Sequence, residues 1–448
     1  MTGLSLAGAF ETSRSALRAS QLGLAVTAQN VAGADQDGYV RRRVDTVTLG
    51  PAAGVSRIWA TVGPGASNGV QSSVNRLADV VLDGRVRVET SREAAAGGVA
   101  ATLRGVEGTF DEPSDTGLAA GLDDLWNSFT DLASGSGETV LAKAGTVVDR
   151  LHNAAASLAD QEADATARLG STVDAAAGLT TTLGRLNEAI AAATASGQSV
   201  PDLLDQRDRV TSQLASSIGA TTTLAADGTA TVTLGGASLV AGSTVTALAV
   251  GADGASVTVD GAEATLTAGS AAAEVSALRT TLPAYRARLD EIAVSLRDTV
   301  NSALTAGYTA SGSPGTSLFT GSGAADLAVA VTDPSDLAVT SRPGSNDSDV
   351  AQALSQAGLR PDGPDSRYRT LIRTVGAESA RAADAATVAG AATAAVTSAR
   401  QSAESVSVDE ELTAMLGYQR SYQAASRVLT TVDEMLDQLI NRTGRVGT

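Results

Sequence analysis

The two ends of the chain carry apolar stripes with the spacing of helices that pack along one face. Near the N-terminus, Phe10, Leu17, Leu24 and Val31 follow one another at intervals of seven residues. This interval places side chains on one seam of an α-helix, as in a coiled coil. Asp and Gly residues at 35–38 favour turns, so the predicted helix ends before them.

The C-terminal stripe is longer, and its helix has a clear beginning. A helix is predicted over 408–441, with Ser407 as the N-cap and Glu410 placed to complete a capping box. Acidic residues in its first turn suit the positive end of the helix dipole. Its seam alternates steps of three and four residues through Met415, Tyr418, Tyr422, Ala425, Leu429, Val432, Leu436 and Leu439.

Neither stripe is wide enough to hold a helix in place by itself. Most helices in proteins owe their stability to the packing of an amphipathic face, and a helix without that packing frays. We therefore predict that the two ends pair with each other and become fully ordered when helices of neighbouring subunits cover them. A closed bundle within one chain is the alternative, and the sequence leaves it open.

Between its ends the chain has the pattern of a helical stalk. Residues 46–70 favour loops and short strands, and a short hairpin is expected between 327–331 and 337–339. Helical periods are predicted at about 75–106, 117–132, 140–195, 202–218, 273–305 and 366–399.

The period changes to two between residues 220 and 269, where β-branched and polar residues alternate. Three Asp-Gly pairs, at 227–228, 253–254 and 260–261, divide this stretch. Asp-Gly favours the tight turns of β-hairpins. The sequence therefore predicts a small antiparallel β insert that faces outward from the stalk.

The expected fold class is mainly α with inserted β. We expect an elongated rod with paired, coiled-coil-like terminal helices, a helical stalk domain and a small antiparallel β domain inserted in mid-chain. The predicted domains are a terminal helical assembly domain (1–44 and 404–448), a stalk with short β-hairpins (45–218 and 272–403) and the β insert (219–271).

Composition excludes several classes of protein. The chain has 49 acidic and 32 basic residues, a net charge of −17, whereas a nucleic-acid binder needs a basic surface. The short basic run Arg41-Arg42-Arg43 lies among residues that favour a turn and is interpreted as a solvated face, with contact to an acidic partner as the alternative. Cysteine is absent, and no apolar run reaches the roughly 18 residues of a membrane span. Glu11 and the arginines that follow it interrupt any secretory signal, so the protein is expected to be either cytoplasmic or exported by a route that needs no cleaved signal.

No residues stand out as catalytic. Residues 65–69 match the Gly-x-Ser-x-Gly pattern of hydrolases, but no strand–turn–helix context surrounds Ser67, and His152 is the single histidine of the chain. We assign no catalytic residue, cofactor-binding residue or metal ligand, and we expect a protein that is not an enzyme.

Both ends resemble one family. Residues 24–32, followed by 38–41, resemble the N-terminal signature of the bacterial flagellar rod, hook and hook-associated proteins, although Asp37 stands where that family usually has proline. Residues 408–411 and 418–424 resemble the closing helix of the same family. The N-terminal residues that carry the match are Asn30, Gly38 and Tyr39.

A segment in the middle of the chain indicates which members of this family the chain resembles most. It consists of Asp202, Leu203, Leu204, Asp205, Gln206, Arg207 and Asp208, and it is similar to a motif of hook-associated members at the hook–filament junction. From the residues alone, Arg207 and Arg209 are expected to pair with the acidic residues of this segment within one helical turn.

The resemblance implies an extracellular structural subunit of the flagellum, exported by the flagellar type III system. It implies four partners: hook protein, hook-associated protein 3, other copies of the chain in a ring, and an export chaperone on the C-terminal helix. Nucleic acid and membrane are not expected as partners. The alternatives are another flagellar axial protein such as hook protein, or a secreted adhesin or hydrolase on flagellum-like ends.

Overall fold

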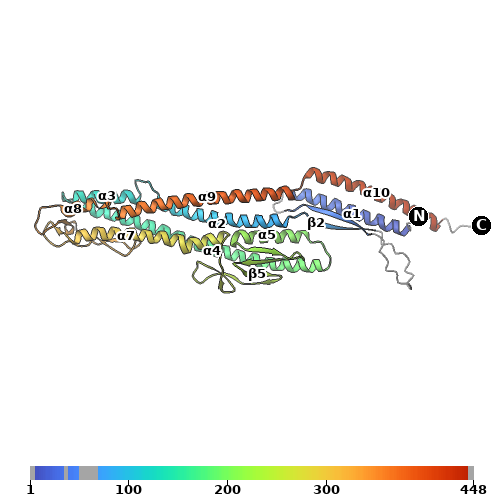
Figure 1. Ribbon diagram of the computed structural model, residues 1–448, viewed down its shortest axis with the longest axis horizontal. Helices are drawn as coiled ribbons and strands as arrows, with labels where there is room; N and C mark the ends of the chain where they lie inside the picture. Colours follow the sequence, from blue (N-terminus) through green and yellow to red (C-terminus); the bar gives the residue numbers. More distant parts are fainter. Residues whose placement is uncertain (1–5, 35–38, 50–68, 442–448) are drawn as a thin grey trace, which may run out of the picture.

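Alanine-rich stretches with apolar residues at helical spacing form helices that run along an elongated molecule (Figure 1). The computed structural model describes residues 6–34, 39–49 and 69–441. The longest helix, α4 (Gly137–Ala195), has 59 residues. The expected fold class, mainly α with inserted β, is confirmed.

The helices predicted at 117–132, 140–195 and 202–218 are confirmed, with ends that differ by at most three residues. Besides α4, the helices are α1 (Leu6–Gly33), α2 (Val80–Phe110), α3 (Leu118–Leu132), α5 (Pro201–Ile218), α6 (Ser270–Ser276), α7 (Leu282–Thr305), α8 (Asp349–Ser355), α9 (Pro364–Glu404) and α10 (Val408–Asn441). The chain direction continues from α9 into α10, while α1 runs antiparallel to α10 beside it. Both termini therefore lie at one end of the rod (Figure 1).

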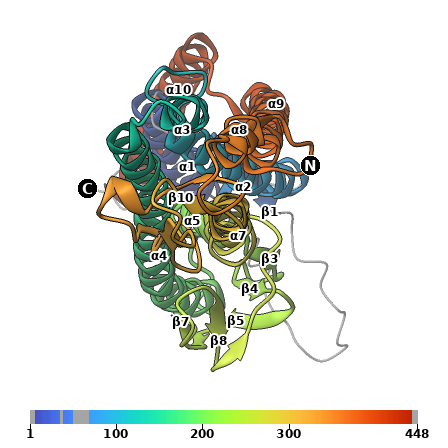
Figure 2. The ribbon, with the colours of Figure 1, turned by 90° about the vertical axis from the view of Figure 1, so that its left-hand side faces the viewer.

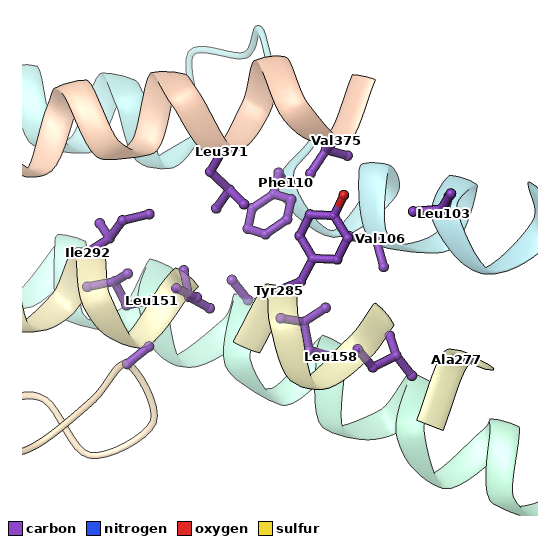
Figure 3. Close-up of a cluster of buried hydrophobic side chains, with 14 of the residues drawn as sticks. Leu103, Val106, Phe110, Leu151, Leu158, Ala277, Tyr285, Ile292, Leu371 and Val375 are labelled. Atoms are coloured by element: carbon purple, nitrogen blue, oxygen red, sulfur yellow. The ribbon is translucent and has the colours of Figure 1, made fainter. Parts of the chain in front are cut away.

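The stalk has a closed apolar core between α2, α3, α4, α7 and α9. Large side chains fill it, and Phe129, Leu151 and Leu289 are fully buried. Figure 3 shows side chains of four of these helices meeting around Phe110 and Tyr285. The hydroxyl of Tyr285 donates to Glu378 (2.5 Å), so this buried polar group has a partner.

The helix predicted over 273–305 is interrupted near its start. α6 passes into a π-helical turn, η1 (Ala277–Thr281), before α7 begins. Pro283 has no amide hydrogen and cannot donate to the carbonyl of Arg279. The amide of Leu282 bonds to the carbonyl of Ala277, five residues back, which is the bond of a π-turn.

The predicted β insert is confirmed as antiparallel strands that lie against α4 and project to one side of the rod (Figure 2). All three Asp-Gly pairs lie in the loops between its strands, and their glycines have positive φ. Asn187 of α4 anchors the insert by donating to Ala230 and Gly242, both at 2.8 Å. Its strands are β3 (Thr221–Leu224), β4 (Ala230–Leu234), β5 (Ala237–Ala241), β6 (Thr244–Val245), β7 (Leu248–Val250), β8 (Val257–Val259) and β9 (Ala262–Glu263).

Two expectations about local structure are wrong. The helix predicted from residue 75 begins only at Val80, because Asp79 caps it by accepting from the amides of Val81 and Leu82. The residues before the cap form β2 (Gly69–Arg76), which pairs antiparallel with β1 (Arg42–Leu49).

The hairpin predicted between 327–331 and 337–339 does not form. Instead β12 (Ala328–Val329) pairs with β11 (Phe319–Thr320), and β13 (Ala338–Thr340) pairs with β10 (Tyr308–Thr309). A 3-10 turn at Pro334–Asp336, capped by Asp333, separates the two strands that were expected to pair. The division of the chain into assembly domain, stalk and insert stays a prediction, and its boundary at residue 44 falls within β1.

Candidate assembly interface

The terminal helices α1 and α10 meet through small residues. On α1, the buried face includes Ser13, Ser20 and Thr27, which are seven residues apart. Each hydroxyl donates to the carbonyl four residues back, at 2.9 to 3.0 Å, so none needs a partner on another helix. At Gly23 the ring of Tyr418 lies directly on the α1 backbone and leaves no room for a side chain. The two helices therefore approach closely.

The predicted apolar seam of α1 lies beside this contact, whereas the α10 seam contributes Tyr418 to it, and both seams are only partly covered. On α10, Ala425 and Val432 are buried. Of the other predicted seam residues, those with described side chains are half-buried: Phe10, Leu17, Leu24, Val31, Met415, Tyr418, Tyr422, Leu429 and Leu436. The side chain of Leu439 lies outside the described residues. Within one chain, the paired helices leave much of their apolar surface accessible.

A second set of apolar residues on α10 faces solvent. Leu412 and Leu416 are four residues apart, and Val428 and Met435 are seven apart, so each pair shares a flank of the helix. All four are exposed, from 43 to 55 %. The sequence predictions missed these flanks, although a helical projection of α10 places them on either side of the seam. Exposed apolar flanks on a paired helix mark a surface that other proteins cover.

Asn30 organises the place where the helix pair joins the stalk. Its side chain is 1 % exposed and uses four hydrogen bonds. It donates to the carbonyl of Arg42 (2.8 Å) and to Glu411 (2.9 Å), and it accepts from the Tyr39 hydroxyl (2.9 Å) and the Arg42 amide (3.0 Å). This network fixes the end of α1 against the start of α10. The family-motif residue Gly38 lies outside the described residues.

Glu411 is the second connection between the helix pair and the start of β1. It is 3 % exposed and accepts from Arg41 Nε at 2.8 Å. Glu410 pairs with the same arginine at 3.1 Å. The capping box predicted at the start of α10 is therefore half formed: Ser407 accepts from the Glu410 amide (3.4 Å), while the carboxylate of Glu410 pairs with Arg41.

Arg42 contradicts the interpretation of residues 41–43 as a solvated face. Its side chain is 5 % exposed and donates to Asp202 (2.6 Å) and Asp205 (2.7 Å). Burial opposes its charge, but the hydrogen bonds that Arg42 donates to these two carboxylates outweigh the effect of burial and raise the pKa of Arg42. The guanidinium also lies over the ring of Tyr39, at 5.1 Å from the centroid. The residues next to Arg42 could not indicate this burial, because its partner Asp202 is 160 residues away in the sequence.

The acidic segment at 202–208 pairs mainly with the β1–β2 hairpin, and of the pairs expected within α5 only that of Arg207 with Asp208 forms in the described residues. Arg76 of β2 lies 2.7 Å from Asp205 and 2.9 Å from Asp208. Arg207 contacts Asp208 and the carbonyl of Gly228 in the β insert, and Arg209 makes no ion pair within the described ranges. Leu203 packs against the stalk core, Leu204 is half-buried and Gln206 is exposed.

The residues of the hydrolase alternative do not come together within the part of the chain that is described. His152 is on α4 and bonds to the carbonyl of Leu327 (2.9 Å), whereas Ser67 lies outside the described residues. In residues 6–34, 39–49 and 69–441, no cluster of His, Asp and Glu has the form of a metal site. None of the described helices is long and apolar enough to cross a membrane.

Comparisons with known proteins match both the middle of the chain and its C-terminal helix to flagellar proteins. The family described as "Flagellar hook-associated protein FlgK helical domain" matches residues 103–319, and "Flagellar basal body rod FlgEFG protein C-terminal" matches residues 400–442. Flagellar hook-associated protein 1 of Bacillus subtilis (strain 168) is 28 % identical over 495 residues, which cover 97 % of this chain and 98 % of that protein.

A solved structure gives the same fold. The flagellar hook junction protein FlgK from Burkholderia pseudomallei superposes with a TM-score of 0.63 at 14 % identity, and it covers 72 % of this chain and 100 % of its own. The first family match covers α3, α4, α5, the β insert and α7, and the second covers α10, so the helical domain and the terminal helix are matched separately. The family matches and the relative that covers nearly the whole chain support the predicted resemblance to flagellar hook-associated protein 1 (FlgK).

Proposed function

We propose that this chain is the structural subunit that joins the hook to the filament of the bacterial flagellum. The observation that carries the proposal is the α1–α10 pair, whose apolar seams and flanks stay partly exposed in the single chain. Such surfaces are satisfied by packing against neighbouring subunits. The rest of the molecule is a closed helical stalk, which suits a component that transmits force.

The partners follow from this position. The family associates with other flagellar axial components. We propose hook protein on one side, hook-associated protein 3 on the other, and further copies of this chain around a ring. An export chaperone would cover α10 before export by the type III route, because its apolar flanks are exposed in the free chain. The seam residues of α1 and α10 are the proposed contacts.

The experiment compares strains that lack this chain and are complemented with variants. Deletion of 408–448 should leave a folded stalk but give hooks without filaments in electron micrographs, with flagellin released into the medium. Leu429→Asp should have the same effect, because a charge on the seam opposes burial against a neighbour. Thr430→Asp is the matched control, since Thr430 is exposed on the same turn of α10. Normal filaments with the deletion or with Leu429→Asp would contradict the proposal.

A further inference from the structure

The helix pair is joined to the stalk by two short non-helical connections. One lies between β2 and α2, at 77–79, and the other between α9 and α10, at 405–407. At the second, Ser405 leaves the helical conformation with ψ of 148°. Two such connections at one end of the stalk form a hinge, unless a contact beside them restrains the helix pair (Figure 1).

The restraint comes from α5, which packs on α4 and α2 and so belongs to the stalk. Its first two turns face the β1–β2 hairpin, which packs on α1. Just before α5, the Ser199 hydroxyl donates to the carbonyl of Val74 at 3.0 Å. The main contact is made by Asp205, which is 8 % exposed and lies within 2.7 Å of both Arg42 and Arg76.

The register of the hairpin explains why this carboxylate is needed. Arg42 and Arg76 are directly opposite each other across β1 and β2. Like charges in that position repel, and here both side chains are also nearly buried, at 5 and 8 % exposure. Asp205 places a negative charge between them. The hairpin therefore holds two buried cations, and the carboxylates that form ion pairs with them in the described residues all belong to α5.

We propose that Asp205, Arg42 and Arg76 form an ion-pair latch that fixes the direction of the α1–α10 pair relative to the stalk. The segment 202–208 thereby works as an internal connector. Arg207 extends it to the carbonyl of Gly228, so the same segment holds the hairpin on one side and the β insert on the other. This inference rests on the fold and does not depend on the place of the chain in the flagellum.

Asp202 provides a matched control within the same motif. It bonds to Arg42 at 2.6 Å, as close as Asp205 does, but its side chain is 76 % exposed. Exposed ion pairs contribute little, because solvent screens them, whereas removing one member of a buried group leaves an uncompensated charge. The latch therefore depends on Asp205 and not on Asp202.

The test measures the distance between the hairpin and the stalk in the isolated full-length chain. The sequence has no cysteine, so Thr46→Cys on β1 and Thr387→Cys on α9, both exposed, can carry spin labels without further changes. Double electron–electron resonance should give a narrow distance distribution in the labelled chain and in Asp202→Asn. Asp205→Asn should broaden and shift it.

Arg76→Gln decides the result if Asp205→Asn fails to fold, which circular dichroism would reveal. This variant keeps the Arg42–Asp205 pair and its charge balance, so the chain should fold while the distribution widens to an intermediate degree. A broad distribution in the labelled chain without further substitution would overturn the latch. So would distributions for Asp205→Asn or Arg76→Gln that match that of Asp202→Asn.

Discussion

The stalk and the terminal helix pair have apolar residues at the same helical spacing, but bury them to different degrees. In the stalk, large side chains such as Phe129 and Leu151 are completely buried between helices of one chain. In the α1–α10 pair, the ring of Tyr418 lies on the backbone at Gly23, while most of the large seam residues are only partly buried. A helical apolar stripe therefore identifies a packing face, but not whether its partner belongs to the same molecule.

This difference in burial predicts that the stalk is more stable than the terminal helix pair. A core of large buried side chains contributes most of the favourable free energy of folding. The helix pair lacks such a core: Asn30 and Glu411 join α1, α10 and the start of β1 to one another, and the latch connects them to the stalk. We expect a stable stalk, and a helix pair that is held at the junction and opens toward its free ends.

The largest expected contrast is in amide hydrogen exchange of the free chain. Amides of α2, α4 and α9 should exchange near the global free energy of unfolding, typically about 5–15 kcal/mol. Amides over 1–40 and 408–441 should exchange fast, with local opening free energies near zero at the free ends and somewhat higher close to Asn30 and Glu411. Uniformly slow exchange in α1 and α10 would favour a closed bundle in the single chain.

Truncating one apolar side chain in each region sharpens the comparison. Phe129→Ala should lower the free energy of unfolding of the stalk by about 3–5 kcal/mol, since Phe129 is fully buried and stacks on Trp126. Leu429→Ala should cost less, about 1–2 kcal/mol, because Leu429 is only partly buried and so has less burial energy to lose. Urea unfolding followed by circular dichroism measures both, and equal losses would contradict the contrast.

Glu411→Gln tests the junction within the helix pair. The substitution weakens charged hydrogen bonds with Arg41 and Asn30 in a site that is 3 % exposed, which should cost roughly 1.5–3 kcal/mol. The loss should appear as faster amide exchange at the start of α10, with little change in α4. Asp409→Asn is the control, since Asp409 is exposed in the same helical turn. Equal changes in exchange for the two variants would argue against a role of Glu411 in the junction.

The smallest effect concerns pH at the end of the stalk beside the junction. Burial raises the pKa of Glu404, against the opposing hydrogen bond from the Asp79 amide, and burial also raises the pKa of Asp83. The folded chain thus binds these protons more tightly than the unfolded chain. The resulting stability is present below the unfolded pKa and is lost as the pH rises through the raised folded pKa.

The matching variant is Glu404→Gln, which cannot ionise. The free energy of unfolding of the natural chain, measured relative to this variant, should fall as the pH rises above the ordinary pKa of a glutamate, about 4.3. Urea unfolding at a series of pH values gives the difference. A difference that rises with pH would show that Glu404 is stabilised in its charged form.

Some of the fold was predictable because it depends on neighbours in sequence. The turn at Asp260-Gly261 formed as expected because both residues adopt positive φ, which Asp-Gly tolerates. The start of α10 followed from Ser407 and its acidic first turn. The predicted start of α2 was wrong because the strand β2 before it is stabilised by pairing with β1, and no local sequence pattern indicates that pairing.

The junction between the helix pair and the stalk shows most clearly which residues the sequence could indicate and which it could not. Asn30 and Tyr39 were singled out by resemblance, and the structure brings them together in one hydrogen-bond network. Arg76 and Glu411 were missed, and Arg42 was assigned to solvent, because charged residues are usually exposed. Their burial depends on Asp205 and Asn30, each far away along the chain.

By itself, the sequence determined the helical periods, the Asp-Gly turns of the insert and the apolar seams at both ends, because each depends on spacing within a few residues. Only the tertiary structure decided that Arg42 and Arg76 lie opposite each other and that Asp205 lies between them. The reason is physical: a buried charge is tolerated only where an opposite charge meets it, and that meeting depends on how distant segments pack.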